Sequence, residues 1–364
     1  MILTVVGARP QFIKAAALSR VLRERLDEKL VHTGQHHDRN MSDVFFDELD
    51  IPRPDVNLGI AGGTHAQMTA RMLIALEEVL DREKPDLLLV YGDTNSTLAA
   101  ALAAAKLGVP VAHVEAGNRV GTLRNPEEVN RILTDHVSAL KFACVPSAMD
   151  ELAKENLLSG AHLVGDPMYD AFLYYRGKAE GSPIRDLLDF DGDPIPLPPR
   201  FYYMTCHRQE NTGDPETLHQ ILSAMDSLDA PAVYPVHPRN RADVEALRAR
   251  HAYRGVLFSQ PVGYLTSIAL VSRAEKVVTD SGGVQREAFF AGKQCVTILD
   301  FVCWPETMTD NRNRLAAPDR DAILAALGRE MRVDPAYRPF GDGHACEKIT
   351  DVLAGLMPGK GGNP

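Results

Sequence analysis

The sequence lacks several features that mark specialised protein classes. Its 364 residues include five cysteines, an odd number without Cys-x-x-Cys spacing, which argues against a disulfide framework and indicates a reducing compartment. We find no secretory signal pattern and no apolar run near the roughly 18 residues that a membrane span needs. The chain also has no basic run, and its net charge is −10. Nucleic acids and anionic membranes are therefore poor candidates for partners.

Two nucleotide-binding fingerprints are missing as well. No Gly-x-Gly-x-x-Gly follows the first apolar run, and no Gly-x-x-x-x-Gly-Lys-Ser/Thr occurs, which disfavours NAD and P-loop chemistry. The adjacent His36 and His37 lack a recognised metal-ligand spacing, so we expect no metal site. The sequence thus predicts an activity that needs neither a metal nor a nicotinamide cofactor.

Strand-like apolar runs alternate with segments of helical period along the whole chain. This alternation is typical of βαβ units and a parallel sheet, and the length suits two such domains. A proline-rich stretch, residues 181–200, separates the two halves and reads as a linker or surface excursion. We predict an α/β fold of two Rossmann-like, doubly wound domains facing a cleft. The first covers residues 1–170 and is joined by a C-terminal helix at 345–358, and the second covers 171–344.

A strand-to-helix turn late in the chain has the features of an anion site. Two glycines, Gly282 and Gly283, allow a ligand to approach the backbone, and Ser281 adds a hydroxyl. The unpaired amides of the helix's first turn would point at a negative group there. One helical turn later, Glu287 is placed to accept hydrogen bonds from a ribose diol. The pattern predicts a nucleotide diphosphate, and an ordinary strand-to-helix connection remains the alternative.

A second turn of this kind opens the chain. The apolar run at residues 1–6 leads through Gly7 and Ala8 into a helix, and Pro10 suits that helix's first turn. Arg9 and Lys14 flank the helix start as a guanidinium fork and a point charge, the two cation types that hold phosphates. We therefore expect both residues to contact phosphate.

Acidic and histidine side chains follow several predicted strands. Asp93 and Glu115 come directly after apolar runs in the first half, and His207 and His237 do so in the second half. Clustered carboxylates raise one another's pKa, so Asp93, Glu115 and the Glu127–Glu128 pair are candidates for moving a proton. The pair also makes a good helix start, and its alternative role is structural. His207 either assists the carboxylates or contacts phosphate.

Together these motifs resemble the non-hydrolysing UDP-N-acetylglucosamine 2-epimerase family. The runs that carry the resemblance keep the family's order: GARPQFIKAA from Gly7, TGQHHD from Thr33, YGDTNST from Tyr91, HVEAG from His113, PEEVNRILTDH from Pro126, HRQEN from His207, PVHPR from Pro235 and DSGGVQREA from Asp280. The resemblance implies a glycosyltransferase-B architecture that holds a nucleotide sugar. Some runs, such as VGDPMYD and PVGYL, resemble the branch that acts on modified UDP-sugars such as UDP-2,3-diacetamido-2,3-dideoxy-glucuronate.

By this resemblance, the activity is inversion at C2 of a UDP-2-acetamido sugar, through loss of UDP to a 2-acetamidoglycal and its re-addition, in nucleotide-sugar and surface polysaccharide biosynthesis. The catalytic residues implied are Asp93, Glu115, Glu127 and His207. Substrate and UDP binding is implied for Arg9, Lys14, Arg131, His237, Ser281, Gly282, Gly283 and Glu287. We expect a UDP-sugar as substrate, no cofactor, a homodimer and a cytoplasmic location.

One segment departs from the family pattern. Where the family has a charged and hydroxyl-bearing loop, residues 299–303 read Leu-Asp-Phe-Val-Cys, which is consistent with a different sugar. Three alternatives stay open: a hydrolysing epimerase that releases free sugar and UDP, a UDP-sugar glycosyltransferase, and a UDP-sugar-binding protein without catalysis.

Overall fold

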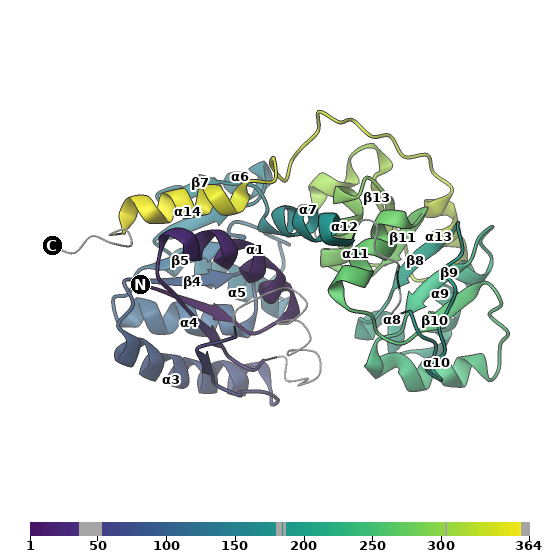
Figure 1. The fold of residues 1–364 in the computed structure, drawn as a ribbon, viewed down its shortest axis with the longest axis horizontal. Helices are drawn as coiled ribbons and strands as arrows, with labels where there is room; N and C mark the ends of the chain where they lie inside the picture. Colours follow the sequence, from purple (N-terminus) through teal and green to yellow (C-terminus); the bar gives the residue numbers. More distant parts are fainter. Residues whose placement is uncertain (36–52, 180–183, 185–186, 303, 358–364) are drawn as a thin grey trace. The chain divides into compact units, whose positions relative to one another are not determined.

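The computed structural model describes residues 1–35, 53–179, 184, 187–302 and 304–357. The chain divides into two compact units (Figure 1). Unit 1 comprises Met1–Leu173 and Arg338–Pro364, and unit 2 comprises Tyr174–Tyr337. Each unit has its own parallel sheet covered by helices, which confirms the predicted α/β class with two Rossmann-like domains. None of the helices in these ranges is long and apolar enough to cross a membrane.

The described residues of unit 1 form a seven-stranded sheet in the order β3-β2-β1-β4-β5-β6-β7. Its strands are β1 (Ile2–Val6), β2 (Glu28–His32), β3 (Val56–Asn57), β4 (Leu87–Tyr91), β5 (Val111–Val114), β6 (Leu140–Ala143) and β7 (Ala161–Leu163). Every residue of β1, β4 and β5 is buried, as expected for parallel strands covered on both faces. The strand order reverses between β1 and β4, and ligands of such sheets bind beyond the strand ends at this point.

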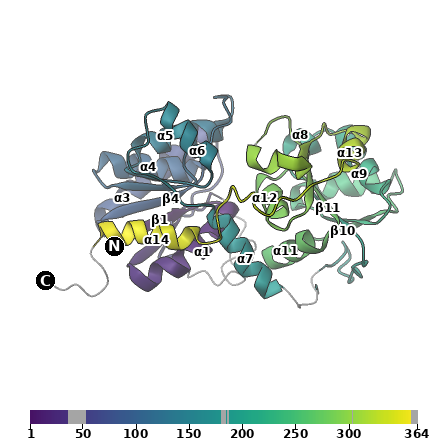
Figure 2. The same cartoon turned by 90° about the horizontal axis from the view of Figure 1, so that it is seen from above.

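The helices around this sheet are α1 (Arg9–Arg25), α3 (His65–Glu83), α4 (Asn95–Lys106), α5 (Pro126–Val137), α6 (Pro146–Lys154), α7 (Pro167–Ala179) and α14 (Ala345–Leu356). Threonine hydroxyls cap two of them: Thr64 accepts from Gln67 N before α3, and Thr94 accepts from Thr97 N before α4. Helix α14 returns from the end of the chain and packs along α1 (Figures 1 and 2). The carboxylate of Asp170 in α7 accepts from Cys346 N at 2.7 Å and so caps α14.

Unit 2 has a parallel sheet whose described strands follow the order β10-β9-β8-β11-β12-β13. The strands are β8 (Tyr202–Thr205), β9 (Ala232–Pro235), β10 (Val256–Ser259), β11 (Lys276–Thr279), β12 (Gln294–Thr297) and β13 (Asn313–Leu315). The helices are α8 (Gln209–Thr212), α9 (Pro215–Asp226), α10 (Arg241–Arg248), α11 (Tyr264–Arg273), α12 (Gly282–Phe290) and α13 (Arg320–Leu327), with short 3-10 helices η1 (Pro238–Asn240) and η2 (Pro305–Asn311). Here the order reverses between β8 and β11.

The proline-rich stretch at 181–200 does not mark the boundary between the units. Residues 180–183 and 185–186 lie outside the described part, but the remainder packs on unit 2. Leu187 is 1% exposed within the apolar cluster that includes Val233, and the Arg241 guanidinium lies over the Phe190 ring. The chain instead passes from unit 1 to unit 2 inside helix α7. Apolar side chains between the prolines pack into the core of unit 2. The proline and glycine content of the stretch did not indicate this packing.

Candidate active site

Three neighbouring elements of unit 1 carry the predicted carboxylates. Asp93 lies in the turn between β4 and α4, Glu115 directly follows β5, and Glu127 lies in the first turn of α5. Strands β4 and β5 are paired in the sheet, and Asn130 of α5 donates to the carbonyl oxygen of Asp93 at 2.8 Å. The three elements are therefore joined at the carboxyl edge of the sheet. Glu127 is exposed at the start of α5, where its N–H donates to Asn125 Oδ1 at 2.9 Å.

Glu115 is held in a conformation that few non-glycine residues adopt. Its φ is 73°, in the left-handed region, and its N–H donates to the carbonyl oxygen of Phe142 at 3.0 Å. The ammonium group of Lys14 on α1 forms an ion pair with its carboxylate, and the two side chains are 3% and 9% exposed. A buried cation therefore faces this carboxylate. Diphosphate binding by Lys14 stays a prediction, because the structure directs its ammonium group to Glu115.

Arg131 of α5 lies between two further carboxylates. Its Nη2 is 2.5 Å from Asp93 Oδ2 and its Nη1 is 3.0 Å from Glu128 Oε2. Burial alone would lower the pKa of Arg131, but the ion pairs with Asp93 and Glu128 outweigh burial and raise it. The sequence suggested a cluster of carboxylates that raise one another's pKa. The structure differs, because Arg131 and Lys14 each place a positive charge next to a carboxylate of this region.

The two members of the Glu127–Glu128 pair have different surroundings. Glu128 is 2% exposed, and its carboxylate accepts from the N–H groups of Val120 at 2.9 Å and Gly121 at 2.8 Å. Those bonds fix the loop after β5, so the structural role considered for the pair applies to Glu128. Glu127 keeps an exposed carboxylate at the same edge of the sheet.

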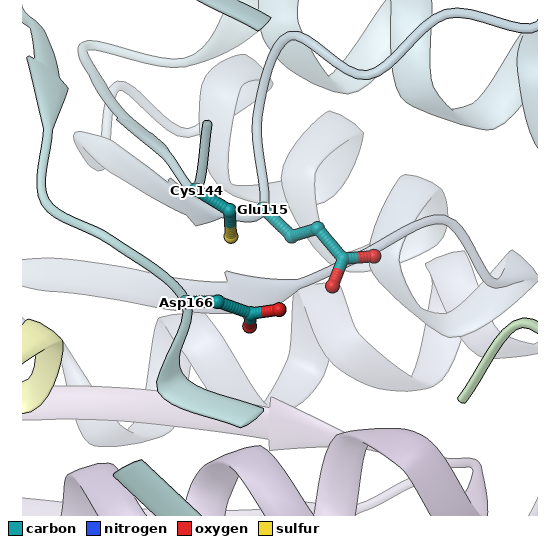
Figure 3. Close-up of side chains that lie close together, drawn as sticks. All are labelled: Glu115, Cys144 and Asp166. Atoms are coloured by element: carbon teal, nitrogen blue, oxygen red, sulfur yellow. The ribbon is translucent and has the colours of Figure 1, made fainter. Parts of the chain in front are cut away.

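A thiol and another carboxylate lie close to Glu115 (Figure 3). Ligand atoms of Glu115, Cys144 and Asp166 are all within 4.8 Å of one another, and the three residues are buried. This cluster is the arrangement in the described ranges that could hold a metal. Lys14 already pairs with Glu115, and Asp166 Oδ1 accepts from Met168 N at 2.9 Å, so both carboxylates have protein partners and we assign no metal to them.

The turn before α1 is filled largely by protein groups. Gln11 Oε1 accepts from the N–H groups of Gly7 at 2.7 Å and Ala8 at 3.0 Å, so these two amides already have an acceptor within the protein. Gly7 is required because a Cβ there would lie 2.2 Å from Ser96 Oγ. Arg9, half-buried at the helix start, remains the residue of this turn that we expect to contact phosphate.

The turn before α12 in unit 2 matches the expected anion site more closely. Ser281 caps the helix, with its Oγ accepting from Val284 N at 3.4 Å, and Gly282 and Gly283 form the first helical positions. The first turn has no acidic side chain that would compete with an anion at the positive end of the helix. Glu287, one turn along, is 3% exposed. Ser281, Gly282 and Gly283 thus lie at the N-terminal end of α12, and Glu287 lies further along the same helix.

His207 and His237 follow the neighbouring strands β8 and β9. Their rings are stacked, with centroids 5.9 Å apart. A buried carboxylate, Asp280, holds His207: its Oδ2 accepts from His207 N and Arg208 N, both at 2.8 Å, and its Oδ1 lies 3.0 Å from His207 Nδ1. With Nδ1 directed to Asp280, the Nε2 atom of His207 is left to act on a ligand.

Burial alone would raise the pKa of Asp280, but its interactions with His207 and with backbone N–H groups outweigh burial and lower it to about 2.

Comparison with known proteins decides the family. A family model described as UDP-N-acetylglucosamine 2-epimerase matches residues 20–354. The chain belongs to the UDP-N-acetylglucosamine 2-epimerase family. It is 47% identical to UDP-2,3-diacetamido-2,3-dideoxy-D-glucuronate 2-epimerase of Pseudomonas aeruginosa, over 98% of this chain and 99% of that protein. It is 33% identical to UDP-N-acetylglucosamine 2-epimerase of Escherichia coli K12, over 97% and 98% of the two chains.

Solved structures agree with this assignment. The crystal structure of Methanocaldococcus jannaschii UDP-GlcNAc 2-epimerase in complex with UDP-GlcNAc and UDP matches with a TM-score of 0.85 and 34% identity, covering 97% of this chain and 99% of that one. The enzyme from Neisseria meningitidis bound to UDP-GlcNAc matches with a TM-score of 0.83 and 28% identity, over 97% and 99%. The resemblance found from the motifs is confirmed.

Three residues that the structure places beside the candidate site residues were not singled out from the sequence. Asp280 was regarded only as part of a turn, and Cys144 and Asp166 were not considered. Asp166 had a detectable signal, because it ends the run AHLVGD just after β7 as Asp93 ends DLLLVYGD just after β4. The link between Asp280 and His207 had no signal, since the two residues are 73 positions apart and meet through strand pairing.

Replacing Asp280 by Asn should lower the free energy of unfolding by about 2 kcal/mol at pH 7. The pKa of Asp280 is lower in the folded protein than in the unfolded chain, so its stabilisation is complete above about pH 5 and is lost as the pH falls towards 2. Denaturant unfolding of both proteins should show about half this difference at pH 3. Asp319→Asn, which keeps an N-cap side chain before α13, is the control. If the two proteins differed in free energy of unfolding by the same amount at pH 7 and pH 3, the lowered pKa of Asp280 would be contradicted.

Proposed function

We propose that this protein is a UDP-2-acetamido-sugar 2-epimerase, which inverts C2 by eliminating UDP and adding it back. The observation that carries the proposal is the set of carboxylates on joined elements of unit 1, at Asp93, Glu115 and Glu127. Inversion needs one group that removes a proton from one face of the sugar and another that returns a proton to the opposite face. The reaction also needs a site for the leaving diphosphate, and the N-terminal end of α12 at Ser281 supports this part of the proposal.

The chemistry follows from the substrate. C2 of a 2-acetamido sugar is not adjacent to a carbonyl, so its proton becomes removable as the C1–O bond breaks and UDP leaves with the electron pair. The resulting 2-acetamidoglycal has a C1–C2 double bond. A carboxylic acid on the other face protonates C2, and a UDP oxygen adds to C1. Cations and amide N–H groups aimed at the diphosphate stabilise the charge that develops on it, and one such donor typically contributes about 3 to 4 kcal/mol.

We assign the residues to the two ends of the substrate. Asp93, Glu115 and Glu127 act on the sugar, and His207, held by Asp280, acts as an acid-base or phosphate-binding group. UDP binding is assigned to Ser281, Gly282, Gly283 and Glu287 in unit 2, while Arg9, Lys14, Arg131 and His237 contribute to substrate and diphosphate binding. Lys14 and Arg131 would do so from their ion pairs with Glu115 and Asp93, which order the carboxylates.

For the sugar, we propose UDP-2,3-diacetamido-2,3-dideoxy-D-glucuronate or a close analogue. This choice is supported by the 47% identity to the Pseudomonas aeruginosa enzyme that bears this substrate's name. It is also supported by the loop at residues 299–302, in which Leu299, Phe301 and Val302 are apolar and the Arg208 guanidinium lies 5.5 Å from the Phe301 ring; Cys303 lies outside the described residues. A homodimer and a cytoplasmic location stay predictions of the sequence.

The test is incubation with a panel of UDP-2-acetamido sugars in deuterated water, followed by proton NMR. We expect the diacetamido-glucuronate to give a C2-inverted product with deuterium at C2, and UDP-N-acetylglucosamine to turn over poorly. Inverted product without deuterium would contradict the elimination mechanism. Release of free sugar and UDP would identify a hydrolysing epimerase, a requirement for an acceptor would identify a glycosyltransferase, and binding without turnover would indicate a protein without catalysis.

A further inference from the structure

A buried histidine connects the elements that carry the carboxylates. His113 lies in β5, and its side chain is 0% exposed. Its Nε2 is 2.7 Å from the carbonyl oxygen of Gly92, the residue before Asp93. Its Nδ1 is 2.7 Å from Oδ1 of Asp135 in α5, the helix that begins beside Glu127. One imidazole ring thus joins the end of β4, strand β5 and helix α5.

Both ring nitrogens of His113 must donate. A backbone carbonyl oxygen only accepts, so the Nε2 atom that faces Gly92 carries a hydrogen. Burial alone would raise the pKa of Asp135, but its neighbours outweigh burial and lower it. Independently of His113, the Arg119 guanidinium lies 2.8 Å from Asp135 Oδ2, and a carboxylate paired in this way with a guanidinium is ionised. An ionised carboxylate also only accepts, and Nδ1 therefore carries a hydrogen as well. The geometry points to a buried His113 ring that donates from both nitrogens.

Asp135 is shared between this imidazolium and a second cation. Its Oδ2 accepts from Arg119 Nη1 at 2.8 Å and from Gly117 N at 3.0 Å, in the loop after β5. Arg119 also forms a bidentate pair with Glu155, at 2.7 and 2.9 Å. Charges of alternating sign thus extend from the fully buried His113 to Glu155, whose side chain is 25% exposed.

Two more titratable groups border this network. Lys141 of the neighbouring strand β6 donates to the carbonyl oxygen of Ser138 at 2.9 Å and is attracted by Asp135. His136 of α5 has its Nε2 3.2 Å from Glu155 Oε2. Neither contact replaces the two bonds that His113 makes, so the connection between the end of β4, β5 and α5 depends on the doubly protonated ring.

We propose that His113 is a positioning residue for the epimerisation: as an imidazolium it sets the mutual placement of Asp93, Glu115 and Glu127. The proposal rests on the function proposed above. Each of these carboxylates stands on a different element, and the ring binds all three elements at once. A displacement of about 1 Å between reacting groups can reduce a rate by about 100-fold, so a bond that fixes these elements bears directly on turnover.

His113→Phe keeps the ring volume and removes both donors. We expect kcat to fall by about 100-fold, while the KM for the UDP-sugar and the affinity for UDP change little, because the substitution removes none of the residues assigned to binding. The matched control is His162→Phe, the same substitution in strand β7 of the same sheet, which should retain activity. A folded His113→Phe protein with the kcat of the unmodified enzyme would overturn the proposal.

A second measurement does not depend on activity. In protein labelled with nitrogen-15 at histidine, NMR should show both ring nitrogens of His113 bearing a proton at pH 7, and one unprotonated nitrogen would overturn the proposal. If His113→Phe fails to fold, Asp135→Asn serves instead, and it should give a neutral His113 together with reduced kcat. If NMR shows both His113 nitrogens protonated but the unmodified protein does not epimerise the UDP-sugar, the proposed function is contradicted. The protonation state of His113 would still stand as a finding.

Discussion

Replacement of Asp93, Glu115 or Glu127 by the corresponding amide is expected to lower kcat by at least about 100-fold, the contribution that positioned acid-base groups typically make. Each amide keeps the size of the side chain and cannot exchange a proton with C2. The affinity for UDP, measured by calorimetry, should change little because the substitutions keep the residues assigned to UDP at the start of α12 and the cations assigned to its diphosphate. The rate is measured as C2 inversion and as deuterium uptake at C2 from deuterated water.

The control for these amides is Glu77→Gln, an exposed glutamate on α3 that has no assigned role. Its kcat should equal that of the unmodified enzyme. Full activity in the three amide variants would mean that the carboxylates at the edge of the unit 1 sheet are structural, and the elimination mechanism would have to be abandoned.

Lys14→Met should destabilise the protein by about 3 to 5 kcal/mol, because it leaves Glu115 buried opposite an apolar side chain. Methionine has a length close to that of lysine, so packing changes little and the lost charge dominates. The double variant Lys14→Met/Glu115→Gln should recover most of the stability, since no buried charge is left unpaired, and it should remain inactive. Denaturant unfolding of the two single variants and the double variant measures the coupling between the residues.

Lys29→Met is the comparison for this cycle. Lys29 also pairs with a glutamate, Glu83, but its side chain is 45% exposed, so water replaces the lost partner and the effect should be far smaller. Equal stability of the Lys14→Met variant and the double variant would show that the buried pair does not stabilise the fold. The recovered stability without recovered turnover would separate the structural role of the pair from the chemistry of Glu115.

Much of the fold and part of the site could be predicted from local patterns. Apolar runs alternating with helical periods are set by burial on both faces of a parallel sheet, and this fixed the α/β class and two Rossmann-like units. Side chains directly after a parallel strand must lie at its carboxyl edge, which placed Asp93, Glu115, His207 and Ser281 correctly on their units. These statements need only the order of residues along one strand and the turn that follows it.

The partners of those side chains were decided by tertiary structure. Lys14 meets Glu115, Arg131 meets Asp93, and Asp280 holds His207, yet each pair is distant in the sequence. Strand order brings such residues together, and it depends on how each crossover helix packs back onto its sheet, which no local pattern encodes. The sequence by itself determined the family, the α/β fold of both units and the residues that follow the strands. Only the tertiary structure decided which charges neutralise one another, because an ion pair depends on a distance between side chains rather than on a spacing along the chain.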